Sequence, residues 1–307
     1  MAPVKTRALP RAGLLGNPSD LYGGRGIAFT FADCAAVVEA TPAAAPDLPH
    51  DLLRAAHTVF AAHAAAAGVP EGRLAARSCA LRFQTDIPRQ VGLAGSSAIV
   101  IAALRALALW HDLPLPPLVL AELALRAEVD VLGIRGGPMD RLAQAFEGVL
   151  AMDFAAPFAE GSTERLDPAL LPPLLIAYDH EPKSSSGQVH NPVFERWQKG
   201  DPEVHAVVRE YRPLVEEGLR ALHAGDHATL RRLVNRNFDL RARLFAIRPR
   251  DRRMIEIGRE RGAATKFCGS GGAILVVPAR AEAIPELRAV YQGEGFATLV
   301  PTVTGPA

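Results

Sequence analysis

The chain has 307 residues, a net charge of +1 and 49% hydrophobic residues, which suffices for one large domain or two ordinary ones and argues against disorder. The balance of 34 basic and 33 acidic residues argues against a general nucleic-acid binder. The sequence has neither an apolar stretch of about eighteen residues nor a signal-peptide core, and Cys34, Cys79 and Cys268 are too scattered for a disulfide framework, so we expect a soluble cytoplasmic protein without membrane contact.

The first half of the chain alternates strand and helix patterns. Ile27, Phe29 and Phe31 recur at the two-residue period of a strand, whereas the apolar residues between 50 and 67 fall on one helical stripe. The expected elements are a strand within 26–40, a helix over 50–67, a strand over 78–83, helices over 97–110, 116–131 and 138–146, and a strand over 148–154.

The segment 155–173 is rich in proline, glycine and charge, which is typical of a linker. We therefore expect two domains, residues 1–158 and residues 159–307. In the second domain the expected elements are a strand over 174–179, charged amphipathic helices between 193 and 262, a glycine loop before a strand over 273–277, and a last helix and strand. Helices and strands alternate in both halves, so the expected class is α+β.

Residues 88–100, PRQVGLAGSSAIV, join a loop to an apolar helix. Gly92 and Gly95 let the backbone approach a ligand closely, and a helix N-terminus offers unpaired N–H groups with about half a positive charge. Together these features make an anion site, where a serine hydroxyl could also coordinate Mg²⁺. An ordinary serine N-cap with glycine in the turn fits the same residues equally well.

Two familiar nucleotide-binding motifs do not fit this chain. A Walker A loop needs a lysine after its glycines, and none follows the glycines of 88–100. The loop at 269–274, GSGGAI, has Ile274 where a dinucleotide-binding fingerprint requires its third glycine. The glycine loops therefore belong to neither of these two classes.

Three motifs follow one another along the chain, with two acidic residues between the second and the third. The motifs are PRAGLLGNPSDLYGG at 10–24, PRQVGLAGSSA at 88–98 and KFCGSGGA at 266–273, and the acids are Glu128 and Asp140. In this order and at these separations the chain resembles the GHMP kinases, the family of galactokinase, homoserine kinase and mevalonate kinase. The combination is far more specific than any one of its parts.

Five longer segments sharpen the resemblance. They are GLLGNPSDLYGG, IPRQVGLAGSSAIV, MDRLAQAFEGVLAMDF, SSGQVHNPVFERWQKGD and KFCGSGGA, spread over about residues 7–277. These segments are similar to the plant-type sugar-acid kinases of the family, which act on D-glucuronate. Typical sugar kinases of the family carry Glu-His where this chain has Asn17–Pro18, and that difference speaks against a galactokinase.

The resemblance implies the two-domain GHMP kinase fold, with an N-terminal domain like domain 2 of ribosomal protein S5, a ferredoxin-like α+β C-terminal domain, and the active site between them. It implies transfer of the ATP γ-phosphate to the anomeric hydroxyl of D-glucuronate, with Mg²⁺. Two alternatives stay open: a family member acting on another sugar or sugar acid, such as galacturonate, arabinose or a heptose phosphate, and a non-catalytic nucleotide- or sugar-binding relative. Monomer and homodimer are both open.

Family position assigns the phosphate and metal contacts. The ATP phosphates are expected on Gly92, Leu93, Ala94, Gly95, Ser96 and Ser97, with Gly269, Ser270 and Gly271 of the third motif. Ser97 and Glu128 match the Mg²⁺ ligands, because Mg²⁺ prefers such oxygens. A glutamate near the end of an amphipathic helix could equally be a solvated charge.

Asp140 matches the catalytic carboxylate of the family, either as a base for the sugar hydroxyl or as a charge that orients it. A carboxylate in the first turn of a helix could also simply cap that helix. Arg11 matches a basic residue that steadies Asp140 or the charge on the transferred phosphoryl group. An ordinary surface arginine on a strand fits Arg11 equally well.

The resemblance also implies a set of sugar contacts. These are Asn17, Asp20, Tyr22, Asp140, Ser186 and His190. An ordinary aspartate turn with a packed tyrosine, and a satisfied loop histidine, explain Asp20, Tyr22 and His190 as well.

A uronic acid needs a partner for its carboxylate, and arginine suits that role best. Arg89 is the first candidate for it, and Arg25, Arg135 and Lys183 are the others.

In the third motif, Lys266 precedes the glycine loop. It fits a salt bridge or a neighbour of the phosphates, and Cys268 is expected only to fill space.

Overall fold

The computed structural model describes residues 2–180, 186–303 and 305. In these residues three antiparallel sheets form, with the strand orders β1-β4-β5, β2-β3-β6-β7 and β11-β8-β10-β9. The strands are β1 Val4–Ala8, β2 Arg11–Leu15, β3 Arg25–Thr30, β4 Ala36–Pro42, β5 Cys79–Thr85, β6 Val149–Asp153, β7 Thr163–Leu166, β8 Leu175–Tyr178, β9 Ala264–Phe267, β10 Ala273–Val277 and β11 Ala297–Leu299.

Helices connect these strands. They are α1 Asp51–Ala66, α2 Glu71–Ala75, α3 Gly95–Trp110, α4 Pro117–Arg126, α5 Met139–Phe146, α6 Ser186–Gln198, α7 Pro202–His223, α8 His227–Leu244, α9 Pro249–Glu260 and α10 Ile284–Gly293. The short turns are η1 Ser19–Tyr22, η2 Ala127–Val131, η3 Pro168–Leu170 and η4 Ala281–Ala283.

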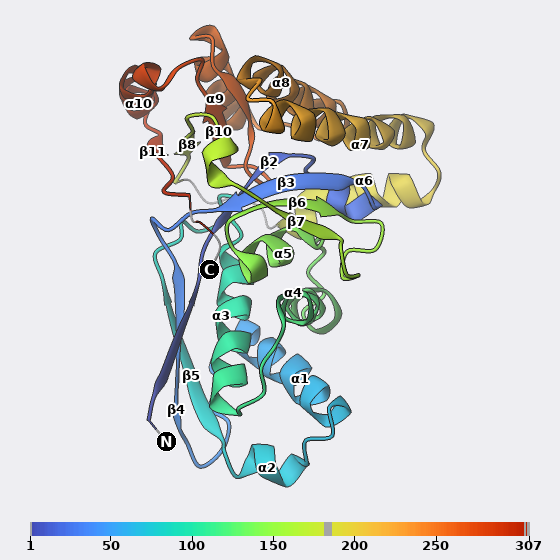
Figure 1. Ribbon diagram of the computed structural model, residues 1–307, viewed down its shortest axis with the longest axis vertical. Helices are drawn as coiled ribbons and strands as arrows, with labels where there is room; N and C mark the ends of the chain where they lie inside the picture. The colour runs from blue at the N-terminus through green and yellow to red at the C-terminus, as the bar shows by residue number, and fades with distance from the viewer. Residues whose placement is uncertain (1, 181–185, 304, 306–307) are drawn as a thin grey trace.

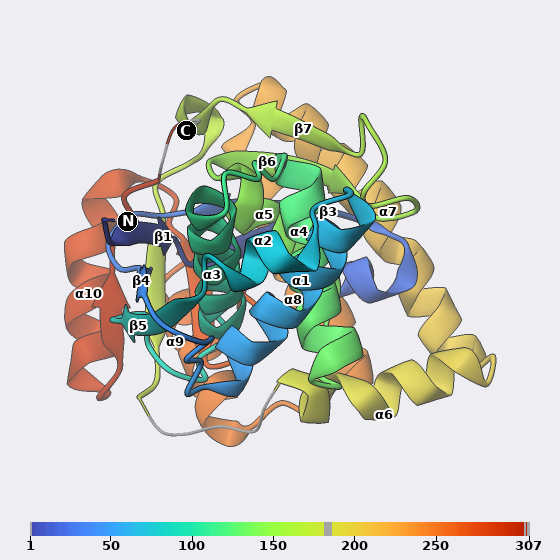
Figure 2. The same ribbon diagram turned by 90° about the horizontal axis from the view of Figure 1, so that it is seen from below.

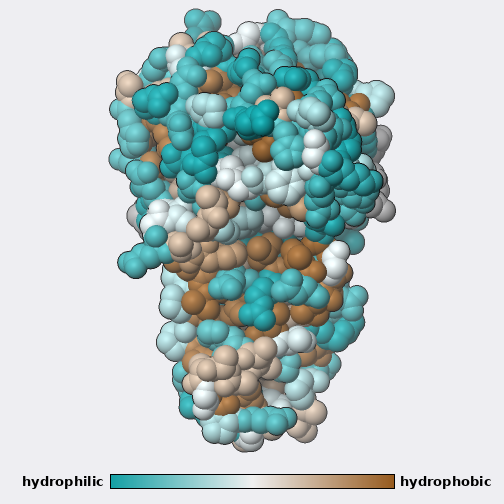
Figure 3. Space-filling view, turned by 90° about the vertical axis from the view of Figure 1, so that its right-hand side faces the viewer, coloured by the Kyte–Doolittle hydropathy of each residue, from teal (hydrophilic) through white to brown (hydrophobic). Residues whose placement is uncertain are grey.

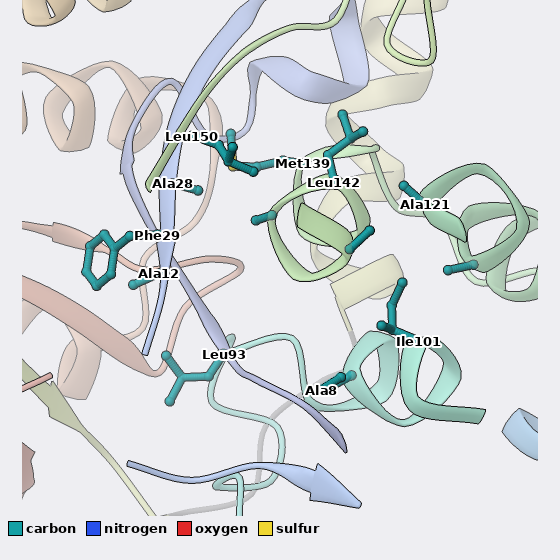
Figure 4. Close-up of a cluster of buried hydrophobic side chains, with 14 of the residues drawn as sticks. Ala8, Ala12, Ala28, Phe29, Leu93, Ile101, Ala121, Met139, Leu142 and Leu150 are labelled. Atoms are coloured by element: carbon teal, nitrogen blue, oxygen red, sulfur yellow. The ribbon is translucent and has the colours of Figure 1, made fainter. Parts of the chain in front are cut away.

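The sheet β2-β3-β6-β7 forms the middle layer of the molecule (Figure 1). Helices α7 and α8 cover one face of this sheet, and α5 packs against the other. Because both faces of β3 are covered, Ile27, Ala28 and Phe29 are all fully buried instead of alternating with exposed residues. Figure 4 shows Phe29 on one side of β3 and Met139 of α5 on the other.

Helix α3 forms the centre of the N-terminal part, below the middle sheet in Figure 1. It packs against β1 and β4 on one side and against α1 and α4 on the other (Figure 2). Its residues are apolar on nearly every face, as is required of a helix that is buried all round. The glycine loop that precedes α3 is therefore anchored to a rigid element.

The third sheet has the strand order of a ferredoxin-like domain. Its strands and helices follow as β8, helices, β9, β10, α10 and β11, and the two terminal strands β11 and β8 are neighbours. Helices α9 and α10 pack against this sheet. The expected α+β class and ferredoxin-like C-terminal architecture are thus confirmed.

The sequence pattern indicates the longer elements well and misses the short strands β1, β7 and β9. The one strand expected within 26–40 is two strands, β3 and β4. The helix expected over 116–131 is α4 followed by η2, a π-helical turn. The strand β7 lies after the predicted boundary at residue 158 and pairs with β6, so the middle sheet continues to Leu166. The boundary itself stays a prediction.

The surface differs between the two parts. On the face in Figure 3 the upper, C-terminal part is mostly hydrophilic, and hydrophobic residues gather in a band across the N-terminal part below it. Among the described residues no helix combines the length and the apolar character needed to cross a bilayer.

Candidate active site

A cavity of about 760 Å³ lies where the three sequence motifs meet. Its walls come from η1, the loop between β5 and α3, the segment from η2 to α5, α8 and the third motif. The predicted site residues that line it are Arg11, Asn17, Asp20, Arg89, Gly92, Leu93, Ala94, Gly95, Ser96, Ser97, Glu128, Asp140, Gly269 and Ser270. Tyr22 and Gly271 are not among its lining residues.

The loop before α3 is built for close approach by its backbone. The φ angle is positive at every second residue of this loop: 56° at Gln90, 77° at Gly92 and 62° at Ala94. This alternation of backbone conformation turns successive N–H groups toward one side, where an anion fits. Ala94 is the N-cap of α3, and no side chain caps this helix. The serine N-cap considered above is therefore wrong, and the first N–H groups of α3 are left for a ligand.

Ser96 and Ser97 lie in the first turn of α3 and point at Glu128. The Ser96 hydroxyl donates to Glu128 Oε1 at 2.9 Å, and the Ser97 hydroxyl donates to Oε2 at 2.8 Å. Glu128 is fully buried in the π-helical turn η2, so it is not a solvated surface charge. Arg141 donates to Oε2 from Nε at 2.9 Å and from Nη2 at 2.5 Å.

The oxygens of Ser97 and Glu128 fit a Mg²⁺ ion in their chemistry. A carboxylate and a hydroxyl are hard donors, and Mg²⁺ in phosphoryl-transfer sites takes few protein ligands besides phosphates and water. Glu128 Oε1 accepts a bond from Ser96 but none from Arg141 among the described contacts. Arg141 and Ser97 therefore bind Oε2 of Glu128, and Oε1 is bonded to Ser96 alone among these residues.

Arg11 connects Asp140, the predicted catalytic carboxylate, to the phosphate loop, the segment 92–97 that is expected to hold the ATP phosphates. It lies at the start of β2, and its Nε and Nη2 each lie 2.6 Å from Asp140 Oδ1. Its Nη1 donates to the carbonyl oxygen of Gly92 at 2.8 Å. Arg11 is only 5% exposed, so the alternative of an ordinary surface arginine is wrong.

Asp20 lies against Gly137 and close to the charge of Asp140. A Cβ atom on Gly137 would lie 2.1 Å from Asp20 Oδ2, so the close contact requires glycine there. Desolvation, and then the charge of Asp140, raise the pKa of Asp20 to about 6, while Arg11 and Arg141 act in the opposite direction. Asp20 therefore titrates near neutral pH, unlike an ordinary turn aspartate.

The third motif braces the first motif. Lys266 is buried and donates to the carbonyl oxygens of Gly13 at 2.6 Å and Phe267 at 2.7 Å; burial lowers its pKa to about 7. It does not line the cavity, so its contacts favour a bracing role over a phosphate contact. Cys268 is fully buried, and burial raises its pKa to about 12, which fits the expected space-filling role.

Asn17 lies between these motifs and is held mostly by backbone. Its side-chain nitrogen lies 3.4 Å from the carbonyl oxygens of both Phe267 and Gly269. Asn237 of α8 accepts a bond from the Gly16 N–H at 2.7 Å and donates to the Asn17 carbonyl at 3.0 Å. Asn17 is thus tied into the fold as well as lining the cavity.

The remaining sugar-contact candidates are placed unevenly. Tyr22 stacks on Phe194 of α6. For Ser186 and His190 the structure describes helix α6 but not the side chains, and Lys183 lies outside the described residues.

The carboxylate candidates also differ in their surroundings. Arg25 lies 3.6 Å from Asp153 and 3.7 Å from Glu216 and does not line the cavity. Arg135 lines the cavity and donates to Asn191 at 2.7 Å. Arg89 is exposed at the cavity wall.

Two residues of the cavity wall, Arg141 and Arg241, were missed from the sequence, and so was Asn237, which bonds the backbone of the first motif. Leu230, Leu233 and Val234 of α8 begin a buried stripe that continues with a 3.6-residue period through Asn237 and Arg241. A polar residue at a core position of such a stripe is the signal that could have identified the two residues on α8. Arg141 carries no comparable signal, because its partner Glu128 is distant in sequence.

Family models match both parts of the chain. The model described as the GHMP kinases N terminal domain matches residues 52–148, and that described as GHMP kinases C terminal matches residues 219–293. Glucuronokinase 1 of Arabidopsis thaliana is 35% identical and covers all of this chain and 93% of its own length. Probable glucuronokinase 2 of the same plant is 37% identical over 88% of this chain and 83% of its own length.

A solved structure supports the fold. The galactokinase of Lactococcus lactis complexed with galactose superposes with a TM-score of 0.80, covering 99% of this chain and 94% of the enzyme. The two sequences are only 15% identical, so this likeness concerns the arrangement of helices and strands.

Proposed function

Because this chain belongs to the GHMP kinase family, as a phosphotransferase that acts on an alcohol group of a sugar, we propose that it transfers the γ-phosphate of ATP to the anomeric hydroxyl of D-glucuronate. The product is glucuronate 1-phosphate. The observation that carries the proposal is the bridge from Asp140 through Arg11 to the Gly92 carbonyl, which couples a carboxylate at the sugar side to the phosphate loop.

The loop before α3 holds the ATP phosphates. Its N–H groups and the unpaired N-terminus of α3 provide fixed positive potential, which phosphoryl transfer needs for positioning and charge neutralisation. Gly269 and Ser270 of the third motif close the same wall of the cavity. In this arrangement the backbone places the γ-phosphate toward Asp140 and Arg11.

Asp140 acts on the sugar hydroxyl. The hydroxyl oxygen forms a bond to the γ-phosphorus while the bond from phosphorus to the β–γ bridging oxygen breaks, and ADP leaves. The hydroxyl proton passes to Asp140 or is directed by its charge. Arg11 holds Asp140 Oδ1 with two nitrogens and keeps a positive charge beside the transferred phosphoryl group.

Ser97 and Glu128 are the residues that would hold Mg²⁺, which supplies charge neutralisation on the phosphates when it is bound. Ser96 orients Glu128 through its hydroxyl, and Arg141 fixes the other oxygen of the carboxylate. Arg141 is buried and hydrogen-bonded on both sides, to Glu128 and to the Gly137 carbonyl at 2.8 Å. Arg141 thereby fixes the position of the Glu128 carboxylate relative to the turn before α5.

The choice of D-glucuronate rests on the two glucuronokinases, which match nearly the whole chain. A second sugar is a weaker candidate. A heptose phosphate kinase of Campylobacter jejuni, named for D-glycero-alpha-D-manno-heptose 7-phosphate, is 40% identical but over only 25% of this chain. Arginines in the cavity walls suit either acid group, so the extent of the sequence match is what favours the uronic acid.

A panel of sugars tests the proposal. The purified protein is incubated with ATP, Mg²⁺ and one of a dozen sugars and sugar acids, including D-glucuronate, D-galacturonate, L-arabinose and D-galactose, and ADP release is followed. We expect D-glucuronate to give the highest kcat/KM, with the phosphate at the anomeric carbon by NMR. Turnover of a neutral sugar in preference to every uronic acid contradicts the substrate, and ATP binding without any turnover contradicts the catalytic role.

A further inference from the structure

Five guanidinium groups line the cavity, and their pairing differs. Arg11 and Arg141 are ion-paired with Asp140 and Glu128. Arg89 is exposed, and Arg135 donates to Asn191. The fifth arginine is Arg241 of α8, which is 2% exposed and has no acidic partner within salt-bridge distance among the residues that the structure describes.

Arg241 is held on its flat faces and left open at its nitrogens. Its guanidinium carbon lies 4.6 Å from the ring centre of Phe245 and 5.3 Å from that of Phe267. Its Nη2 donates to the Ser270 carbonyl at 3.1 Å, whereas Nε and Nη1 have no hydrogen-bond partner in the described part of the chain. Burial lowers its pKa, which is the sign of a charge that the folded protein solvates poorly.

Two buried tyrosines near Arg241 have the same deficit. The hydroxyls of Tyr22 and Tyr211 are buried without a hydrogen-bond partner among the described residues, and both tyrosines, with Asp20, are electrostatic neighbours of Arg241. Buried polar groups are nearly always paired in folded proteins, and breaking the pairing of a buried charge is expensive. The two tyrosines do not line the cavity, whereas Arg241 does, so the unpaired nitrogens of its guanidinium are the groups that point to an anionic ligand there.

The location of Arg241 suits the acid group of a sugar better than a phosphate. Asp20 is an electrostatic neighbour of Arg241 and also of Asp140 and Arg11, and all four residues line the same cavity. Arg89 lies beside the glycines of the second motif, whereas Arg241 lies on α8 and bonds the Ser270 carbonyl at the edge of the third motif. In a uronic acid the carboxyl is attached on the other side of the ring oxygen from the anomeric carbon, so its partner must lie beside the reacting centre and outside the phosphate loop.

From these observations we infer that Arg241 is the specificity-determining residue of this site, binding the carboxylate of a uronic acid while Asp140 faces the anomeric hydroxyl. The inference rests on the proposed function and replaces Arg89 as the partner of the carboxylate. The rings of Phe245 and Phe267 hold the guanidinium plane in place, so a carboxylate can bind with little loss of side-chain freedom.

A substrate pair that differs only in charge tests the inference. The kcat/KM values for D-glucuronate and for its uncharged isostere D-glucuronamide are measured with the wild-type protein and with Arg241→Met, Arg241→Lys and Arg89→Met. The ratio compared is kcat/KM for D-glucuronate divided by kcat/KM for D-glucuronamide. We expect Arg241→Met to lower this ratio by about 10- to 100-fold, and Arg241→Lys to give a ratio between that of Arg241→Met and that of the wild type. Arg89→Met should keep the wild-type ratio, and the KM for ATP should change little in Arg241→Met.

The ratio does not depend on the fraction of folded enzyme, so a variant that folds poorly still gives a valid answer. An unchanged ratio in Arg241→Met overturns the inference and leaves the proposed function standing. A ratio that collapses in Arg89→Met returns the role to Arg89. A wild-type protein that turns over other sugars but no uronic acid overturns the proposed function, and the inference with it.

Discussion

At the scale of single residues, Asp140 is the side chain on which the proposed phosphoryl transfer depends most directly. Asp140→Asn keeps the shape of the side chain but removes its charge and its ability to take a proton. We expect kcat to fall by about 10²- to 10⁴-fold while the affinity for ATP changes little, because the phosphate loop contacts Arg11 rather than Asp140. Steady-state kinetics with ADP release and calorimetry with an ATP analogue measure the two quantities; a fully active variant contradicts the mechanism.

Asp20 should make the enzyme sensitive to mild acid. Its pKa is raised to about 6, so below that pH it is protonated and, as the proposed sugar contact, has less capacity to accept hydrogen bonds from the substrate. We expect kcat/KM for the sugar to fall as the pH drops through about 6. Asp20→Asn should be less active, and its pH profile should lack this acidic limb. A profile of the variant that keeps the same limb would assign it to another group.

The same shift has a consequence for stability. A carboxylate whose pKa is raised in the folded state stabilises the protein where it is protonated in both states and loses that contribution as the pH rises through its folded pKa. Asp20→Asn should therefore have a higher Tm than the wild type at pH 7. The difference should shrink toward pH 4, as thermal denaturation across that range can show.

The sequence alone identifies the residues that carry family motifs, because Ser97, Glu128 and Asp140 lie in conspicuous segments. Arg241 was missed although it continues the apolar stripe of α8, because an arginine in a charged helix is ordinarily taken for a solvated side chain until the helix is seen to bury it. The carboxylate partner expected at Arg89 stays a prediction: the residue lines the cavity but is exposed in the fold.

At the scale of elements, the contact between the second and third motifs is as important as either motif. A Cβ atom on Gly269 would lie 2.3 Å from the Gly92 carbonyl oxygen and 2.9 Å from Arg11 Nη1. We expect Gly269→Ala to displace the phosphate loop and to lower kcat/KM for ATP by up to about 100-fold. Gly293→Ala, at an open position at the end of α10, is the matched control. Equal kinetics in the two variants would contradict the prediction, because they would show that the loop accommodates the added methyl group at residue 269.

The elements differ in how much of them local sequence can predict. The long helix α3 follows from its continuous apolar run and α8 from its apolar period. The turn between α7 and α8 follows from Gly225 and Asp226. The short strands β1 and β9 do not follow from local sequence, because β1 depends on a partner far away in the chain and both have few residues of their own. The π-helical turn that buries Glu128 is likewise a result of packing.

At the scale of the whole molecule, Asn237 connects α8, in the C-terminal part of the chain, to the first motif. Its replacement by leucine leaves the Gly16 N–H and the Asn17 carbonyl buried without their partner. We expect the free energy of unfolding of Asn237→Leu to fall by about 3 kcal/mol, measured by urea denaturation. Arg232→Ala, on the exposed side of α8, should stay within about 0.5 kcal/mol of the wild type; equal losses would contradict the tie.

The third sheet has a consequence for how the protein is made. Its strand β8 pairs with β11 through Tyr178, Ala177 and Ile176, and just beyond β11 the Thr302 carbonyl accepts a bond from the Ala32 N–H at 2.9 Å. On the ribosome, β8 emerges well before β11, so one edge of β8 stays open while α6 to α10 are being synthesised. The C-terminal sheet can close, and the contact with residue 32 can form, only when β11 and residue 302 have left the exit tunnel.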